Sequence, residues 1–442
     1  MFSPTTDSKK VNLLYGKTGI TLTVPESADV LEGEHVTPIN NPEAELLKAF
    51  NNPISSQPLE KLLTIRKPKT VAVTISDITR PVPNKKILPP LLQTLNKAGI
   101  SDSQIVIIIG TGMHRTSTPQ ERESLLGKDI LERIEIIDHT ADKPETLVKV
   151  CDVPPVYVCR RFVEADFKIV TGFIEPHFMA GFSGGRKGVC PALVDLRTVQ
   201  RFHGYETLSN PNAASGILNA NPCHKIASEV AKIVGVDFLV NVGLTREKKI
   251  AGIYCGNIEK AHLTGCQQVA KWTTAYVEKS YDLVITNGGG YPLDESFYQA
   301  TKGICGALPA LTEDSTLLVV SRCGEKLGSK IFTDTMLKYD NDWRKFLSDI
   351  SSAEKTILDQ WGYHMHTRVL ERIGLEKLLF VSDGIPQEMQ KHISVTPVLG
   401  NGNASQRAQT AIDQFLSTHN NPRIAVIPEG PYTMLCNKKN SN

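Results

Sequence analysis

The sequence predicts an α/β protein built from two α/β domains with mainly parallel sheets and an active-site cleft between them. Two observations lead to this fold class. The chain has 442 residues, which is more than one hydrophobic core usually supports, so two domains are expected. Short apolar runs of strand length also alternate with helical patterns along most of the chain, as they do in parallel α/β sheets.

The first expected element is a β-hairpin over residues 11–24, where apolar and polar residues alternate around a turn at 16–19. Apolar runs of the buried-strand type follow it. They predict strands over residues 70–76, 105–109, 133–137, 168–171, 237–242, 282–286, 316–320, 377–381 and 423–427.

Helix signals complete the pattern. Residues 118–121 predict a helix start with a capping box and a proline at the first helical position. A helical pattern over 258–279 precedes the strand that begins at 282, and we place the domain boundary near residue 280, between the two. The expected organisation is a domain over 1–279, a domain over 280–436 and a disordered tail over 437–442.

Composition limits the classes of function. Hydrophobic residues make up 40% of the chain, charged residues 22%, and the net charge is +2. These values describe a globular protein with no electrostatic reason to bind nucleic acid or a membrane surface, so the expected partner is a small molecule. The nine cysteines are scattered without a CxxC pair, which indicates a reducing compartment. Without a signal peptide or an eighteen-residue apolar stretch, the expected location is the cytoplasm.

Several loops that contain charged or polar residues follow directly after predicted strands. They cover residues 77–83, 110–115, 171–177 and 287–292. In open α/β sheets, ligands bind at the carboxyl ends of the strands. We therefore expect these loops to form a binding site.

The run 175–187 is the most informative segment. It places His177 ten residues before Lys187, and His203 follows sixteen residues later. Glycines let backbone N–H groups converge on a ligand, an amine can become a covalent attachment point, and imidazoles bind metals or move protons. The segment is not a Walker A loop, because Gly188 stands where Ser or Thr should bind magnesium. The alternative is a tight loop with a solvated lysine.

Four further residues are candidates for a site. His114 lies in the glycine-containing loop 110–115. Arg80 lies in a proline-stiffened loop and presents a planar fork that suits a carboxylate, although a surface ion pair is the alternative. Gln299 and Lys302 would share one face of a helix, where they could also be a solvated stripe.

Taken together, these segments resemble the lactate racemase family, whose members use a nickel-pincer nucleotide, pyridinium-3,5-bisthiocarboxylic acid mononucleotide nickel. The matching segments are 14–17, 77–80, 110–115, 176–187 and 287–302, together with His203 and Trp361. The resemblance implies an isomerase that racemises or epimerises a 2-hydroxy acid, and cofactor biosynthesis proteins as partners.

The resemblance also implies roles for single residues. Lys187 resembles the lysine that is joined covalently to the cofactor, and His203 resembles the histidine that completes nickel coordination beside sulfur ligands. His114 and His177 match the two catalytic histidines, one on each face of the substrate. The matched substrate-binding positions are Arg80, Gln299 and Lys302, and the expected cofactor-binding positions are Asp77, Ser183, Gly184, Gly185, Tyr298 and Trp361.

The mechanism that the family implies is hydride transfer. One histidine takes the hydroxyl proton while the hydride on the same carbon moves to the cofactor, which leaves a planar 2-keto acid open to hydride return on its other face. Arg80 and Lys302 would hold the carboxylate. The sequence departs from the family pattern at two positions, and both put lactate itself in question as the substrate. Met113 is a bulky residue next to the catalytic His114. Arg186 is expected to contact the cofactor phosphate or to lower the pKa of Lys187.

Two rival functions stay open at the level of sequence. The first is a nickel-independent nucleotide- or phosphate-dependent enzyme that uses the loop 183–187 for phosphate. The second is a two-domain protein that only binds an anion, which has no obvious need for Lys187 or His203.

Overall fold

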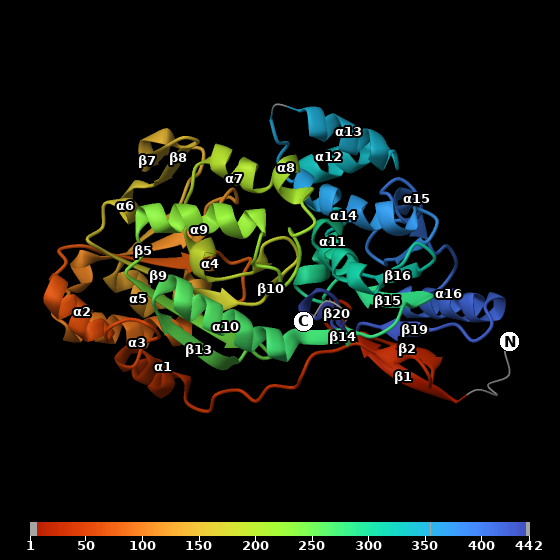
Figure 1. Cartoon of the computed structure of the whole chain (residues 1–442), viewed down its shortest axis with the longest axis horizontal. Coiled ribbons are helices and arrows are strands. Elements are labelled where there is room, and N and C mark those ends of the chain that lie inside the picture. The colour runs from red at the N-terminus through yellow and green to blue at the C-terminus, as the bar shows by residue number, and fades with distance from the viewer. Residues whose placement is uncertain (1–6, 354, 439–442) are drawn as a thin grey trace. The chain divides into compact units, whose positions relative to one another are not determined.

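The computed structural model describes residues 7–353 and 355–438, and it confirms the predicted α/β class. The described chain forms two compact units (Figure 1). The central unit consists of His35–Phe202 and Asn210–Trp272. The terminal unit contains both ends of the described chain: the described residues up to Glu34, the short segment His203–Ser209 and the described residues from Thr273 onward.

The central unit is built on a six-stranded sheet with the order β13-β12-β9-β4-β5-β6. All neighbouring strands are parallel except β13, which is antiparallel to β12. The strands are β4 (Val71–Ser76), β5 (Ile105–Gly110), β6 (Glu135–Asp138), β9 (Phe167–Ile174), β12 (Phe238–Leu244) and β13 (Ile250–Gly256). Two small hairpins pair β7 (Leu147–Asp152) with β8 (Pro155–Cys159) and β10 (Pro176–His177) with β11 (Gly181–Phe182).

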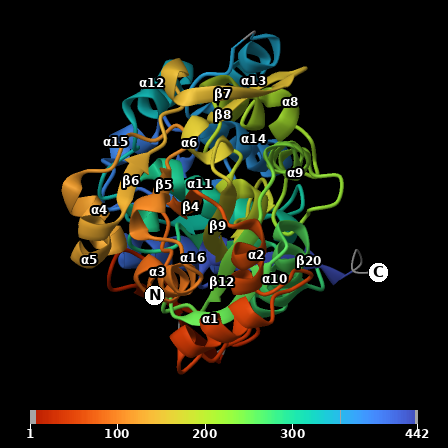
Figure 2. The same ribbon diagram turned by 90° about the vertical axis from the view of Figure 1, so that its left-hand side faces the viewer.

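Helices pack on both faces of this sheet (Figure 2). They are α1 (Pro42–Asn51), α2 (Leu59–Arg66), α3 (Asn84–Lys97), α4 (Pro119–Leu126), α5 (Lys128–Arg133), α6 (Arg160–Val163), α7 (Leu196–Phe202), α9 (Pro222–Val234) and α10 (Ile258–Thr273). Apolar side chains from α1 to α5 form one core with the sheet. On the other face, a Cβ on Gly243 of β12 would lie 2.7 Å from Trp272 of α10.

The terminal unit has a second six-stranded sheet, with the order β18-β17-β16-β15-β19-β3 and every neighbouring pair parallel. Its strands are β3 (Asp29–Val30), β15 (Leu283–Asn287), β16 (Thr316–Val320), β17 (Leu378–Val381), β18 (Thr396–Pro397) and β19 (Ile424–Val426). Its helices are α8 (Tyr205–Leu208), α11 (Phe297–Gly306), α12 (Lys330–Tyr339), α13 (Trp343–Ser352), α14 (Gln360–Ile373), α15 (Gln387–Gln390) and α16 (Ala404–Thr418).

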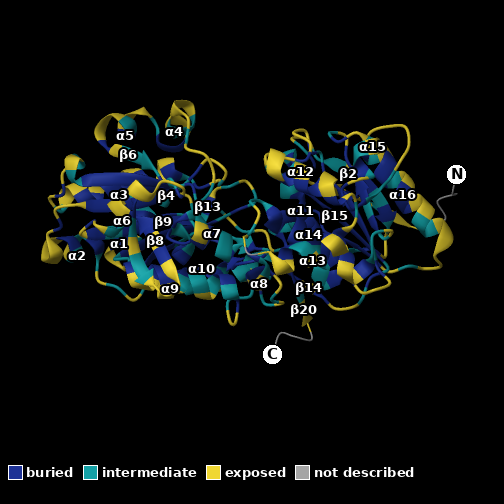
Figure 3. Ribbon diagram, turned by 90° about the horizontal axis from the view of Figure 1, so that it is seen from above, coloured by how far each residue is buried: buried dark blue, intermediate teal, exposed yellow. Residues whose placement is uncertain are grey.

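Alternate residues of these strands enter two different cores. One face packs against α11 to α14. The other face packs against α16 and against the hairpin of β1 (Ser8–Leu13) and β2 (Ile20–Pro25). Figure 3 shows both sheets in the colour of buried residues, while exposed residues gather on outer helices such as α2 and α16.

The structure divides the chain differently from the predicted boundary between residues 279 and 280. The N-terminal hairpin belongs to the terminal unit, because Val11, Leu13, Leu22 and Val24 complete a core there. Strand β3 also pairs with β19. The first described residues therefore pack with the terminal unit.

The predicted helix over 258–279 ends early, at Thr273. The next residues form β14 (Thr274–Val277), which pairs in parallel with β20 (Met434–Asn437) near the end of the described chain. The predicted tail over 437–442 therefore begins within a strand. Lys438 also forms an ion pair with Glu278 at 2.6 Å, and residues 439–442 lie outside the described part of the chain.

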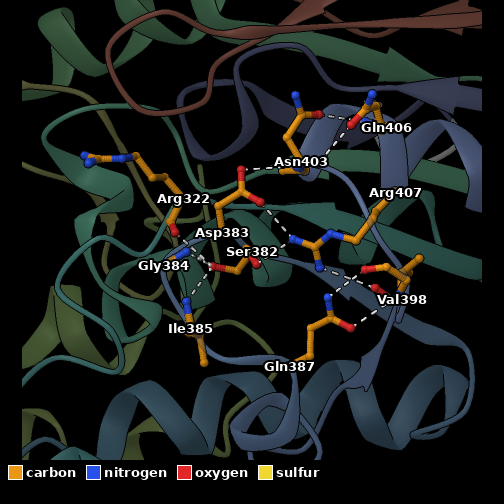
Figure 4. Close-up of polar contacts among 12 residues, drawn as sticks. Arg322, Ser382, Asp383, Gly384, Ile385, Gln387, Val398, Asn403, Gln406 and Arg407 are labelled. Carbon is orange, nitrogen blue, oxygen red and sulfur yellow. Dashed lines mark hydrogen bonds and ion pairs between the residues drawn. The ribbon is translucent and has the colours of Figure 1, made fainter.

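An ion pair between the buried Arg407 and the exposed Asp383 joins three elements at the carboxyl edge of the terminal sheet (Figure 4). Arg407 of α16 donates to the carbonyl of Ser382 and to the carboxylate of Asp383, both at 2.8 Å. The same carboxylate accepts the hydroxyl of Tyr15 at 3.0 Å and the N–H of Ala404 at 3.1 Å. This network fastens the loop after β17 to α16 and to the hairpin region.

The remaining sequence predictions of secondary structure are confirmed. Each of the nine predicted strands is present, and so is the N-terminal hairpin. Thr118 and Glu121 form the predicted capping box at the start of α4. Within the described residues, no helix combines the length and the apolar character needed to cross a membrane.

Candidate active site

The predicted site residues of the central unit lie where its sheet topology reverses. The chain adds β5 and β6 on one side of β4, and then β9, β12 and β13 on the other. Asp77 follows β4 directly, His114 follows β5, and His177 follows β9. In open α/β sheets, ligands bind at the carboxyl ends of the strands beside such a switch point.

Asp77 and His114 form a hydrogen-bonded pair across two neighbouring loops. The His114 Nδ1 atom lies 2.6 Å from Asp77 Oδ2, and the Thr79 hydroxyl donates to Asp77 Oδ1 at 2.6 Å. Burial alone would raise the pKa of Asp77, but the contacts with His114 and Thr79 outweigh it and hold that pKa below its ordinary value. The carboxylate is therefore ionised at neutral pH and orients the histidine ring.

Arg80 lies in the same loop as Asp77. Its N–H donates to the carbonyl of Asp77 at 3.2 Å, and its own carbonyl accepts from Val82 at 2.8 Å. The positive charge of Arg80 also contributes to the lowered pKa of Asp77. Arg80 is half-buried, and an arginine can bind the carboxylate of a small acid with its planar fork of donors.

His177 lies in the short hairpin of β10 and β11 and is buried, with 8% of its surface exposed. The backbone N–H groups of Met179 and Ala180 point at its Nδ1 atom, at 3.4 and 3.2 Å. Gly181 has a φ of +75°, and a Cβ there would lie 2.2 Å from the carbonyl of Ile217. Only glycine fits this position, so the hairpin geometry around His177 is tightly specified.

Arg186 points into the protein and supports the loop from within. Its guanidinium donates to the carbonyls of Ala180 at 2.8 Å, Phe182 at 2.9 Å and Gly184 at 3.3 Å. Burial lowers its pKa to about 10, and His262 Nε2 lies 3.0 Å away. The expectation that Arg186 contacts a cofactor phosphate is therefore corrected: its donors serve the loop that carries His177 and Lys187.

The backbone of this loop is largely occupied by internal hydrogen bonds. The N–H of Ser183 donates to Glu175 at 2.9 Å, that of Gly185 to the Asn241 side chain at 2.7 Å, and that of Lys187 to Gly184 at 3.1 Å. These three N–H groups are not available to a phosphate. The rival function of 183–187 as a phosphate loop loses its main physical support.

Lys187 follows Arg186 in the short 3₁₀ helix η3 (Gly185–Gly188) and is half-buried. Its Nζ atom lies 5.9 Å from the ring centre of Phe202. Burial raises the pKa of the Cys223 thiol to about 12, and the Lys187 charge opposes this shift. Arg186 also opposes the shift at Cys223, so both cationic side chains act on this buried thiol.

The terminal unit carries the other predicted residues. Tyr298, Gln299 and Lys302 lie on α11, the first α-helix after β15, and Trp361 is the second residue of α14. The Oε1 atom of Gln299 is buried and has no hydrogen-bond partner within residues 7–353 and 355–438. A buried amide oxygen without a partner is costly, so Gln299 is suited to accept a hydrogen bond from a ligand.

The predicted nickel ligand lies beside one of two aromatic side chains that contact each other. The rings of Tyr298 and Trp361 lie 4.5 Å apart, and those of His203 and Trp361 lie 6.4 Å apart. The Tyr298 hydroxyl donates to Asp359 at 3.0 Å, which fixes its ring. Three predicted residues therefore come together as one aromatic surface with an imidazole at its side.

The helix α8 explains why His203 belongs to the terminal unit. Tyr205 stacks on His364 of α14 with 5.2 Å between ring centres and 8° between planes. Ser209 lies 3.2 Å from the Nε2 atom of the same histidine. The predicted residues thus fall into two sets, one in each unit.

Several supporting residues escaped the sequence analysis: Thr79, Asn241, His262 and Asp359. Asn241 gave a usable signal, because it is a polar residue inside the otherwise apolar strand β12, where burial demands a partner. The other three lie in a loop, a helix and a turn, and their types are ordinary there.

Comparisons with known proteins show which family this chain resembles. The family model of the lactate racemase N-terminal domain matches residues 15–216, and that of the C-terminal domain matches residues 277–434. A lactate racemase from Thermoanaerobacterium thermosaccharolyticum is 32% identical over 429 residues, which are 95% of this chain and 97% of that protein. A lactate racemase from Lactiplantibacillus plantarum is 34% identical over 390 residues, 87% of this chain and 88% of that protein.

Solved structures show the same relationship. The lactate racemase apoprotein from T. thermosaccharolyticum superposes with a TM-score of 0.88 at 30% identity, over 97% of this chain and 100% of that chain. A protein from Thermotoga maritima has a TM-score of 0.65 at 18% identity, over 92% of this chain and 100% of that chain, and shows the fold alone. The protein is an enzyme of the isomerase class, and the chain belongs to the lactate racemase family.

Proposed function

We propose that this chain racemises or epimerises a small 2-hydroxy acid by hydride transfer, with a covalently attached nickel-pincer nucleotide. Lactate is the first substrate to test, since the named relatives are lactate racemases. The observation that carries the proposal is the Asp77–His114 pair, at 2.6 Å, in loops at the topological switch point. Arg80 on the same loop supplies a cation for the carboxylate of such an acid.

The donor set of the chain fits a metal that brings its own organic ligands. Among residues 7–353 and 355–438, no group of three or more His, Cys, Asp or Glu side chains could hold a metal ion. Sulfur donors from a cofactor, completed by one imidazole, suit nickel. In this proposal Lys187 carries the cofactor and His203 completes its coordination. When bound, the cofactor supplies the hydride acceptor.

Other residues of the proposed cofactor site have supporting roles. Tyr298 and Trp361 offer an aromatic surface beside His203. Ser183, Gly184 and Gly185 shape the loop that presents Lys187. Asp77 was expected among the cofactor-binding residues, and its contact with His114 leads us to propose that it acts through that histidine.

The protein's own groups then perform binding and proton transfer. Arg80 and Lys302 bind the substrate carboxylate as cations, and Gln299 accepts a hydrogen bond with its buried oxygen. His114 takes the hydroxyl proton of one enantiomer, and His177 serves the other face of the reacting carbon.

Partners and location follow from the same proposal. A modified nucleotide must be made and delivered by biosynthesis proteins, which are the expected macromolecular partners. All nine cysteines are free thiols in the structure, which agrees with a reducing compartment and with the proposed cytoplasmic location.

Metal analysis tests this proposal against its rivals. Protein produced together with the cofactor's biosynthesis proteins should contain about one nickel per chain and should racemise lactate or another chiral 2-hydroxy acid. A nickel-independent enzyme or a simple anion-binding protein would show neither dependence. The proposal would be contradicted if protein produced with the biosynthesis proteins contained no nickel. It would also be contradicted if that protein contained nickel but acted on no 2-hydroxy acid.

A further inference from the structure

The two proposed catalytic histidines face opposite kinds of partner through their Nδ1 atoms. For His114 the partner is the carboxylate of Asp77, at 2.6 Å. For His177 the partners are the backbone N–H groups of Met179 at 3.4 Å and Ala180 at 3.2 Å. An ionised carboxylate can only accept a hydrogen bond, and a backbone N–H can only donate one.

The contact with Asp77 sets the proton position on His114. Asp77 is 7% exposed and its pKa lies below the ordinary value, so its oxygen accepts and the His114 Nδ1 atom carries the hydrogen. The Nε2 atom then has a lone pair. A histidine held in this way by a carboxylate is the arrangement of a general base.

The backbone sets the opposite proton position on His177. A nitrogen that accepts two N–H donors carries no proton in the neutral ring, so the hydrogen resides on Nε2. Turning the ring by 180° would place a carbon against both donors, which disfavours the alternative orientation. The loop cannot easily withdraw these donors, because Arg186 binds the carbonyl of Ala180 at 2.8 Å and β10 pairs with β11.

We infer that the two histidines rest in opposite neutral tautomers, so that His114 offers a base lone pair at Nε2 while His177 offers an Nε2–H donor. The backbone N–H groups of Met179 and Ala180 are then positioning groups for His177. The chemical meaning of this asymmetry rests on the proposed function. A proton-accepting step at His177 Nε2 requires a change of tautomer, whereas the same step at His114 does not. The enantiomer whose hydroxyl meets His114 is therefore oxidised faster in the first turnover.

Nitrogen NMR of the cofactor-free chain tests the tautomers directly. The chain is labelled with [¹⁵N]histidine and long-range ¹H–¹⁵N spectra are recorded near pH 8.5, about two units above the ordinary histidine pKa. Signals are assigned by His114→Gln and His177→Gln. Phe178→Leu gives a second assignment, because Phe178 stacks on His177 at 5.2 Å and its ring current shifts that signal.

The expected result is an Nδ1–H pattern for His114 and an Nε2–H pattern for His177, each in at least tenfold excess. Asp77→Asn should alter the pattern of His114 and leave that of His177 unchanged. The same tautomer in both rings, or an even mixture at His177, would overturn the inference. The spectra need neither nickel nor substrate, so failure of the proposed function would appear separately, as protein that never acquires nickel or racemase activity.

Discussion

Replacing Asp77 by asparagine is the sharpest perturbation of the proposed base. The substitution keeps the size of the side chain but removes the charge that accepts the His114 Nδ1–H at 2.6 Å. An amide can instead donate to Nδ1 and favour the wrong tautomer. We therefore expect the substitution to lower the racemisation rate while the fold of the central unit is retained.

The expected loss can be bounded from the contact. A hydrogen bond to a charged group contributes about 1.5–3 kcal/mol, which corresponds to about 10- to 150-fold in rate. A similar substitution in a serine-protease triad costs about 10⁴-fold. The His114 side chain is 43% exposed, so solvent can replace part of the interaction and we expect the smaller range.

The assay is the initial racemisation rate of cofactor-loaded protein, measured by chiral chromatography. Asp102→Asn is the matched control, since Asp102 is a carboxylate of the same unit, paired with Arg133 at 2.9 Å before β5, at the opposite edge of the sheet. The control should keep its full rate. An Asp77→Asn rate within twofold of wild type would refute the assignment of Asp77 as the partner of the base.

The same pair predicts a pH dependence of stability. The folded pKa of Asp77 lies below the ordinary 3.8, so its ionised form stabilises the folded chain above that pH. This contribution is lost as the pH falls through the lower folded value. The stability advantage of wild type over Asp77→Asn should therefore shrink below about pH 4 in urea titrations, and an advantage that grows there would contradict the shift.

Three further predictions concern the loop and the metal. Lys187→Ala should lack the covalent adduct that intact-mass measurement finds in loaded wild type, and an unchanged adduct would remove Lys187 from attachment. His203→Ala should keep part of the organic adduct but lose nickel by metal analysis, and full nickel occupancy would show that His203 is not a ligand. Arg186→Gln should lower the free energy of unfolding by about 3 kcal/mol in urea, because buried carbonyls lose a charged donor. The control is Arg161→Gln, which removes an exposed ion pair with Glu135 and should lower the free energy of unfolding by less than about 1 kcal/mol. Equal losses for the two variants would refute the role of Arg186 in supporting the loop.

Local patterns in the sequence were sufficient to predict the strands that are buried on both faces. A run such as Ile105–Gly110 is short and apolar throughout, which is typical of a buried parallel strand. The edge strand Ile250–Gly256 was missed, because two glycines and a tyrosine interrupt its pattern. The pairing of β14 with β20 joins segments about 160 residues apart. The helical pattern over 258–279 contains no local signal that predicts this pairing.

The site shows the same limit. The spacing of His177 and Lys187 pointed to a functional loop, but the inward direction of Arg186 in a 3₁₀ turn has no periodic signal. The difference between the Nδ1 partners of His114 and His177 depends on a carboxylate in one loop and on backbone donors in another. Such contacts arise only when the strands β4, β5 and β9 bring their carboxyl ends together.

The central claim is that this chain inverts the chiral carbon of a 2-hydroxy acid. The most direct measurement starts from pure L-lactate or pure D-lactate, adds nickel-loaded protein and follows both enantiomers by chiral chromatography. The account predicts that each enantiomer yields the other until the two are equal, and that protein carrying Lys187→Ala yields none. Retention of both starting enantiomers by fully nickel-loaded wild type, with lactate and with a panel of other 2-hydroxy acids, would contradict it.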